Sequence, residues 1–147
     1  MDSKYLLKCR INSARNKIDD LENEIRILRN KIEHLEASYE DKCKQQARME
    51  SVFEKKRLKN AAMRNFVRGV ALMSIVQLYE EKYGYSKSNM LSDNYEQIKG
   101  FIKLNIEKMS DDIIDKQPEI SSLEYNIRQM KRRILEIEEE KREALNE

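Results

Sequence analysis

Apolar residues recur with a regular spacing along the first part of the chain. From Leu7 to Tyr39 the steps between them alternate between four and three residues without a miss. This is a heptad repeat with apolar a and d positions, and most positions between them carry charged or amide side chains. It predicts a long helix with one apolar seam, which must pack against a second helix in this chain or in another protein. The seam residues singled out here are Ile11, Ile18, Leu21, Ile25, Leu28, Ile32 and Leu35.

The seam becomes more polar after Tyr39, although nothing stops the helix. Polar seam positions loosen the packing and often fix the register of a coiled coil. No Gly or Pro occurs before Gly69, so we expect the helix to continue, and we place the first arm at residues 3–57. The next positions in the same phase are Lys42, Gln46, Met49 and Phe53.

The middle of the chain is much more apolar than the first arm. Ten of the fourteen residues from Phe66 to Tyr79 are apolar, so a helix here has no fully polar face. A helix that is apolar all round is normally buried. We therefore expect an apolar middle helix over residues 58–83, which forms either the protein's own core or a surface that a partner covers. The candidate partner-binding residues are Phe66, Val67, Gly69, Val70, Met73 and Val76.

Turn-forming residues follow the middle segment and predict a loop over residues 84–92. Asp93 and Glu96 then have the spacing of a capping box, so we expect the second arm to occupy residues 93–145. A helical stripe follows, made of Ile98, Ile102, Ile106, Met109 and Ile113.

Pro118 interrupts the second arm without changing its phase. Proline ordinarily ends or kinks a helix, because it lacks an N–H and clashes with the preceding turn. Ile113 and Ile120 are nevertheless one heptad apart, so either the helix kinks or a new one begins near Pro118. The heptad resumes with Ile120, Leu123, Ile127, Met130 and Ile134.

Two arms of nearly equal length around an apolar middle predict an all-α fold. We expect an elongated antiparallel helical hairpin or coiled coil with an apolar helical middle segment, forming a single helical domain over residues 1–147. Ile at a with Leu at d also favours parallel dimers, so an intermolecular coiled coil and a homodimer stay open at this point.

The charge pattern does not indicate a nucleic-acid partner. Charged residues make up 38% of the chain, but the net charge is only +2, so no strong overall field is expected. A local basic cluster at residues 55–68 contains no acid, and such a cluster can bind phosphate groups. Phe66 is the only aromatic residue interleaved with it, so we interpret it as a solvated face that pairs with an acidic partner.

Several other functions lack the residues that they require. No stretch approaches the ~20 apolar residues of a membrane span. The beginning of the chain lacks the apolar core of a secretory signal, so we expect a cytoplasmic protein, with co-export beside a partner left open. Cys9 and Cys43 are too far apart on one helix to form a disulfide, and free thiols are expected. His34 is the lone histidine, so no metal site, cofactor site or catalytic His arrangement is expected, and we interpret the chain as non-enzymatic.

The layout resembles the LXG-toxin-associated α-helical targeting proteins of Gram-positive type VII secretion systems. These are distant relatives of the Trp-x-Gly secretion substrates. The resemblance is carried by the heptad-rich first arm, by a bulky residue and glycine in Phe66-Val67-Arg68-Gly69, and by the second arm from Tyr95 through Ile137. The chain contains no Trp, and none of its Phe or Tyr residues has the Asp four residues later that serves related substrates as an export signal.

This resemblance implies a targeting factor, or chaperone, that acts through protein–protein interaction. It would bind the helical LXG domain of a secreted toxin, hold it soluble and help to deliver it to the secretion apparatus. The missing export signal suits a companion that works with a second small helical protein carrying that signal. The alternative is a self-associating structural coiled coil, such as a scaffold or tether subunit.

Overall fold

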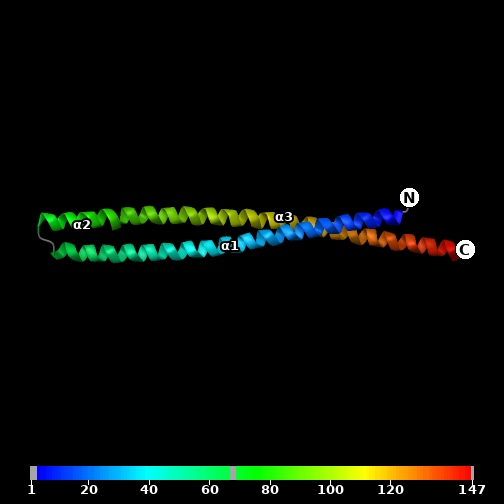
Figure 1. Cartoon of the computed structure of the whole chain (residues 1–147), viewed down its shortest axis with the longest axis horizontal. Helices are drawn as coiled ribbons and strands as arrows, with labels where there is room; N and C mark the ends of the chain where they lie inside the picture. The colour runs from blue at the N-terminus through cyan, green and yellow to red at the C-terminus, as the bar shows by residue number, and fades with distance from the viewer. Residues whose placement is uncertain (1–2, 67–68, 147) are drawn as a thin grey trace. The chain divides into compact units, whose positions relative to one another are not determined.

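The computed structural model describes residues 3–66 and 69–146, and the side chains of these residues except those of Phe66 and 70–72. Every described residue other than Gly69 and Gly84 is helical, which confirms the all-α prediction. The helices are α1 (Ser3–Phe66), α2 (Val70–Tyr83) and α3 (Tyr85–Asn146), shown in Figure 1. Their residues group into two compact units, which we describe separately as unit 1 (Met1–Ile32 with Lys108–Glu147) and unit 2 (Glu33–Glu107). The expectation of a single domain over residues 1–147 stays a prediction.

Unit 1 is an antiparallel pair formed by the first part of α1 and the last part of α3. Two ion pairs define the direction: Lys4 Nζ lies 2.7 Å from Glu138 Oε1, and Lys116 Nζ lies 3.4 Å from Glu24 Oε2. The residue number falls on α3 as it rises on α1, so the two segments run in opposite directions. The predicted antiparallel pairing is therefore confirmed in this unit.

The core of unit 1 consists of the predicted seam residues. Ile11, Ala14 and Ile18 of α1 are buried against Ile127 of α3, and four half-buried residues of α3 pack against them. Full burial of an isoleucine side chain stabilises a fold by ~1.5–3 kcal/mol, so a few such residues supply much of this unit's stability. The four half-buried residues are Ile120, Leu123, Met130 and Ile134.

Unit 2 is also an antiparallel pair, in which the second part of α1 lies beside α2 and the start of α3. Gln46 Nε2 donates to Glu96 Oε1 at 3.2 Å, and Ser92 Oγ donates to Glu50 Oε1 at 2.8 Å. Farther along α1, Phe53 meets the ring of Tyr83 edge-on, with the ring centroids 5.6 Å apart. In Figure 1 the green end of α1 accordingly lies beside α2.

The seam of α1 continues through unit 2 in spite of its polar residues. Lys42, Gln46 and Met49 are half-buried and Phe53 is buried, all in the phase set by the first arm. The helix continues as expected, but it ends at Phe66 and not at residue 57. The long aliphatic stems of Lys and Gln can cover apolar surface while their polar ends reach water, which explains why the seam tolerates them.

The prediction of one middle helix over residues 58–83 is wrong, because the helix is interrupted within this range. Residues up to Phe66 belong to α1, and α2 begins at Val70. Gly69 precedes α2 with φ = 123°, a backbone conformation that L residues with a side chain rarely adopt. Its carbonyl accepts the N–H of Met73 at 3.2 Å, which starts the helical ladder of α2.

The predicted loop over residues 84–92 is also wrong, because only Gly84 interrupts the helices there. α3 begins at Tyr85, and the Ser88 N–H donates to the Gly84 carbonyl at 3.0 Å. Ser88 is buried and Ser92 is half-buried, so packing of this segment overrides the turn preference of its residues. Glu96 consequently lies inside α3 and does not act in a capping box.

In the second arm, the exposure of Ile98 differs from the prediction. Ile98 belongs to the predicted stripe but is 44% exposed, because the seam of α3 passes through Tyr95 and Lys99 on either side of it.

α3 is continuous through Pro118, so no new helix begins there. Pro118 lies on the exposed side of α3, where water can bond the carbonyl that proline leaves without an N–H partner.

Candidate functional site

The predicted partner-binding residues lie around the break between α1 and α2, but they do not all share one surface. Val76 is 1% exposed, so it belongs to the core of unit 2. The prediction that Val76 faces a partner is therefore wrong. Met73 is exposed on α2, and Gly69 forms the break itself. Val67 lies outside the described residues, as do the side chains of Phe66 and Val70.

Unit 2 exposes many large apolar side chains, and apart from Ile98 and Met73 the sequence analysis did not single them out. Most of them lie outside the a and d positions of their helices, and this is the signal that could have identified them. On α3, Ile98, Phe101 and Leu104 follow one another at three-residue spacing and are all exposed. The others in unit 2 are Val52, Leu58 and Met63 of α1, Met73, Ile75 and Leu78 of α2, and Tyr85 and Met90 of α3.

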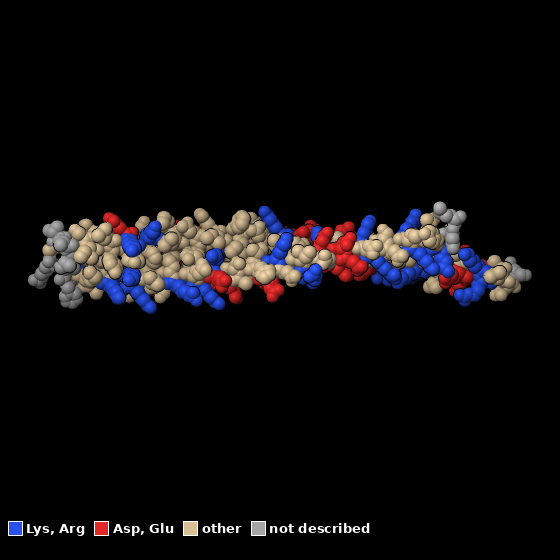
Figure 2. Space-filling model, viewed as in Figure 1, with Lys and Arg blue, Asp and Glu red and all other residues tan. Residues whose placement is uncertain are grey.

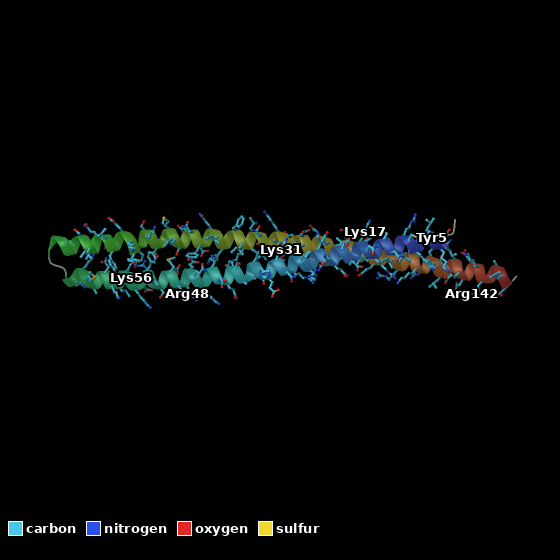
Figure 3. All side chains as sticks on the ribbon, in the orientation of Figure 1. Tyr5, Lys17, Lys31, Arg48, Lys56 and Arg142 are labelled. Carbon is cyan, nitrogen blue, oxygen red and sulfur yellow. The ribbon has the colours of Figure 1, made fainter. Side chains whose placement is uncertain are left out.

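Charged residues leave much of the visible face of unit 2 free. In Figure 2 a broad area without charged side chains lies to the right of α2, with Lys and Arg along its lower edge, while charged side chains of both signs appear at α2 itself. A shallow hollow on α1 combines apolar and basic surface. Its apolar lining is Val52 and Leu58, and its basic lining is Lys55, Lys56 and Lys59. Lys56 and Arg48 are labelled on this part of α1 in Figure 3.

Beside this hollow, a cleft of about 530 Å³ is lined by residues of all three helices. Its volume falls within the usual range for ligand pockets, roughly 300–1,000 Å³. Three cations of the predicted basic cluster line it, with the carboxylates of Glu54 and Glu80. Arg64 forms an ion pair with Glu80, so one cation and one anion neutralise each other. The cleft residues used below are Lys56, Arg57, Asn60, Arg64, Tyr83 and Tyr85.

Aromatic rings hold the remaining cations of this basic–aromatic cleft. The guanidinium carbon of Arg57 lies 4.1 Å from the centroid of the Tyr85 ring. Lys56 Nζ lies 5.5 Å from the centroid of Tyr83, which Tyr79 contacts from the same helix at 5.3 Å. Such cation–π contacts stabilise by ~0.5–1 kcal/mol at exposed sites. Sequence analysis recognised the basic residues but missed these tyrosines, because they come from other helices.

Two polar atoms in the cleft residues have no hydrogen-bond partner. They are Arg57 Nη1 and Asn60 Oδ1, which are both enclosed by protein. Asn60 is only 5% exposed and occupies a position in the phase of the α1 seam. Leaving a buried donor or acceptor without a partner costs about 1–3 kcal/mol, so these atoms are a local source of instability in unit 2.

A polar network crosses the seam of unit 2 at some distance from this cleft. Lys99 Nζ lies 2.8 Å from Glu96 Oε1, and Gln46 donates to the same carboxylate. The hydrogen bond from Lys99, followed by that from Gln46, lowers the pKa of Glu96. The same contact raises the pKa of Lys99. Tyr39 adds a further cation contact, since Lys103 Nζ lies 5.2 Å from its ring centroid.

The described residues contain no group of three or more His, Cys, Asp or Glu side chains arranged to hold a metal ion. Cys9 is exposed, Cys43 is half-buried, and both are free thiols. Within the described part of the chain, none of the helices is long and apolar enough to cross a membrane. What unit 2 offers a partner are exposed apolar side chains and a basic–aromatic cleft.

Comparison with known proteins finds no relative: no protein family, no curated protein and no solved structure matches this chain.

Proposed function

We propose that this chain is a non-enzymatic helical binding protein that pairs with the LXG domain of a secreted toxin and helps to target it to a type VII secretion apparatus. The observation that carries the proposal is the set of large apolar side chains exposed on unit 2. Phe101 is 67% exposed and Leu78 is 63% exposed, although both belong to helices whose seams are already packed. The layout's resemblance to LXG-associated targeting proteins supplies the identity of the partner.

A helical pair whose seam is already packed has no internal need for apolar residues on its other faces. Soluble monomers rarely expose large contiguous apolar patches, and such patches commonly mark protein interfaces. A helical partner can cover these side chains by packing an apolar stripe of its own against α2 and α3. In this proposal pairing takes place in the cytoplasm, before export of the toxin.

The test is co-expression with the N-terminal helical domain of an LXG toxin encoded beside this protein, followed by size-exclusion chromatography and calorimetry. We expect a stable complex with the wild-type chain. Phe101→Asp and Met73→Asp should each weaken it by at least about tenfold, because an interface hot spot contributes about 2 kcal/mol or more. Circular dichroism should show unchanged helix content in both variants.

Tyr125→Asp is the matched control, since Tyr125 is an exposed aromatic residue of α3 that lies in unit 1. It should bind the toxin domain as the wild type does. No complex with the wild-type chain would contradict the proposal. Self-association of the chain alone, abolished by Phe101→Asp, would instead support the scaffold function, because a second copy would then cover the apolar side chains.

A further inference from the structure

We propose that the basic–aromatic cleft of unit 2 is a binding site for an acidic side chain of a partner polypeptide. The cleft lies on the unit that carries the exposed apolar side chains, but the proposal needs only a partner with accessible carboxylates. It therefore does not depend on the partner being a toxin.

Two cations of the cleft lack a counterion. Arg64 is neutralised by Glu80, whereas Lys56 and Arg57 have no carboxylate within ion-pair distance among the described residues. Three cations and two carboxylates, those of Glu54 and Glu80, line the cleft, so it keeps an excess of positive charge that favours an anion.

The two polar atoms without a hydrogen-bond partner indicate what kind of anion fits the cleft. Arg57 Nη1 needs an acceptor and Asn60 Oδ1 needs a donor. A glutamate or aspartate side chain supplies the acceptor, and an arginine fork binds a carboxylate well because its parallel N–H groups match the two oxygens. A polypeptide supplies the donor as well, because backbone N–H groups lie beside its acidic side chains. The pair of atoms therefore fits a polypeptide segment.

The enclosed guanidinium of Arg57 becomes available when the ring of Tyr85 moves. Arg57 stacks on Tyr85, which is 70% exposed and lies in the first turn of α3. Because most of this ring faces water, it can rotate aside without unpacking the seam of unit 2. A carboxylate can then replace the ring against the guanidinium, which exchanges a cation–π contact for a charge-assisted hydrogen bond.

The rim of the cleft favours a macromolecule over a free carboxylic acid. Leu58 lines the cleft and is 64% exposed, and Tyr85 is exposed beside it. A free acid such as acetate would leave these apolar surfaces in water, whereas apolar residues flanking a glutamate would cover them. The expected ligand is therefore a segment in which leucine-like and acidic residues are neighbours.

The test uses fluorescence anisotropy with a labelled, blocked peptide that alternates leucine and glutamate, and with its glutamine counterpart. We expect the wild-type chain to bind the glutamate peptide at least about tenfold more tightly, because charge-assisted hydrogen bonds are stronger than neutral ones. Arg57→Gln should remove this preference while its melting temperature shows that the chain is folded. Arg133→Gln, which removes an exposed arginine of unit 1, should bind both peptides as the wild type does.

Equal binding of the two peptides, or an unchanged preference in Arg57→Gln, would overturn the proposal. Vesicles containing phosphatidylglycerol provide the second arm of the test. Vesicle binding that depends on Arg57, without any preference for the glutamate peptide, would reassign the cleft to a membrane surface and overturn it as well. No toxin domain is present in these assays, so their outcome is independent of the pairing test with Phe101→Asp.

Discussion

Asn60 is a polar residue buried where the seam of α1 otherwise carries apolar side chains. Its Oδ1 has no hydrogen-bond partner, so the fold bears the cost of removing this atom from water. Buried polar residues in coiled coils typically reduce stability while favouring one register. Asn60→Leu should therefore raise the free energy of unfolding by about 1–3 kcal/mol, measured by chemical denaturation. A lower stability in Asn60→Leu would mean that Asn60 makes a favourable interaction in the fold.

Ile127, in contrast to Asn60, is a buried apolar side chain, and it lies in the core cluster of unit 1. It is 7% exposed and packs against Ile11, Ala14 and Ile18. Ile127→Ala should lower the free energy of unfolding by about 2–5 kcal/mol, through lost burial and the cavity left behind. Leu135→Ala is the control on the same helix, because Leu135 is 61% exposed, and it should change stability by less than about 0.5 kcal/mol. Equal effects of the two substitutions would show that unit 1 is not packed as described.

Individual site residues were harder to predict than core residues, for a physical reason. A heptad identifies which side of a helix is buried, and Ile11, Ile18, Ile25 and Ile127 are buried as predicted. It does not identify which helices meet at a given level. Tyr83 and Tyr85 join the basic residues of α1 only because the chain folds back within unit 2, so the cleft could not be predicted from local spacing.

At the scale of helices, the seams were predictable and the ends of the helices were not. Both arms keep one heptad phase, because a shift would move apolar side chains into water. The expected loop over residues 84–92 depended on the weak helix propensity of its residues, which differs by less than about 1 kcal/mol per residue for most residue types. Burial of Ser88 and partial burial of Leu91 and Ser92 are enough to override such preferences. Gly84 does interrupt the helices where the predicted loop begins, whereas the predicted middle helix ran through Gly69, which has a positive φ.

Pro118 provides a test of the continuity of α3. Proline inside a helix costs ~3 kcal/mol relative to alanine, and Pro118 lies on the exposed side, where alanine creates no cavity. Pro118→Ala should restore the hydrogen bond to the carbonyl of Ile114 and raise the melting temperature. Calorimetry would measure the change, with Glu119→Ala as an exposed control beside it. A destabilised Pro118→Ala variant would indicate that two separate helices meet at this proline.

At the scale of the whole molecule, ion pairs make stability depend on pH. The contact with Lys4 lowers the pKa of Glu138, and the contact with Lys99 lowers the pKa of Glu96, both from an ordinary value of 4.5. A lowered carboxyl pKa stabilises the fold above the ordinary value, and the contribution is lost as pH falls through the lowered value. The melting temperature should therefore decline below about pH 4.5, and less steeply in Glu138→Gln.

At alkaline pH, stability depends on pH in the opposite direction, because it falls as pH rises. Hydrogen bonds to Asp112 and to Glu96 raise the pKa values of Lys116 and Lys99 above 10.5. Their contribution is complete below 10.5 and disappears as pH rises through the raised values, so the melting temperature should also decline there. A melting temperature that is constant from pH 3 to pH 11 would show that these pairs do not contribute.

Both proposals rest on the chain folding back on itself within unit 2, and cross-linking measures this directly. Glu50 and Ser92 are joined by a 2.8 Å hydrogen bond, so cysteines at these positions should react with one short bismaleimide in a chain that lacks Cys9 and Cys43. We expect a cross-link within a single chain, identified as a monomer whose mass has increased by that of one reagent molecule. The pair Glu50→Cys with Glu107→Cys should give none, because residue 107 lies roughly four helical turns farther along α3. Cross-linked dimers from the first pair, or equal yields from both pairs, would contradict the antiparallel fold-back.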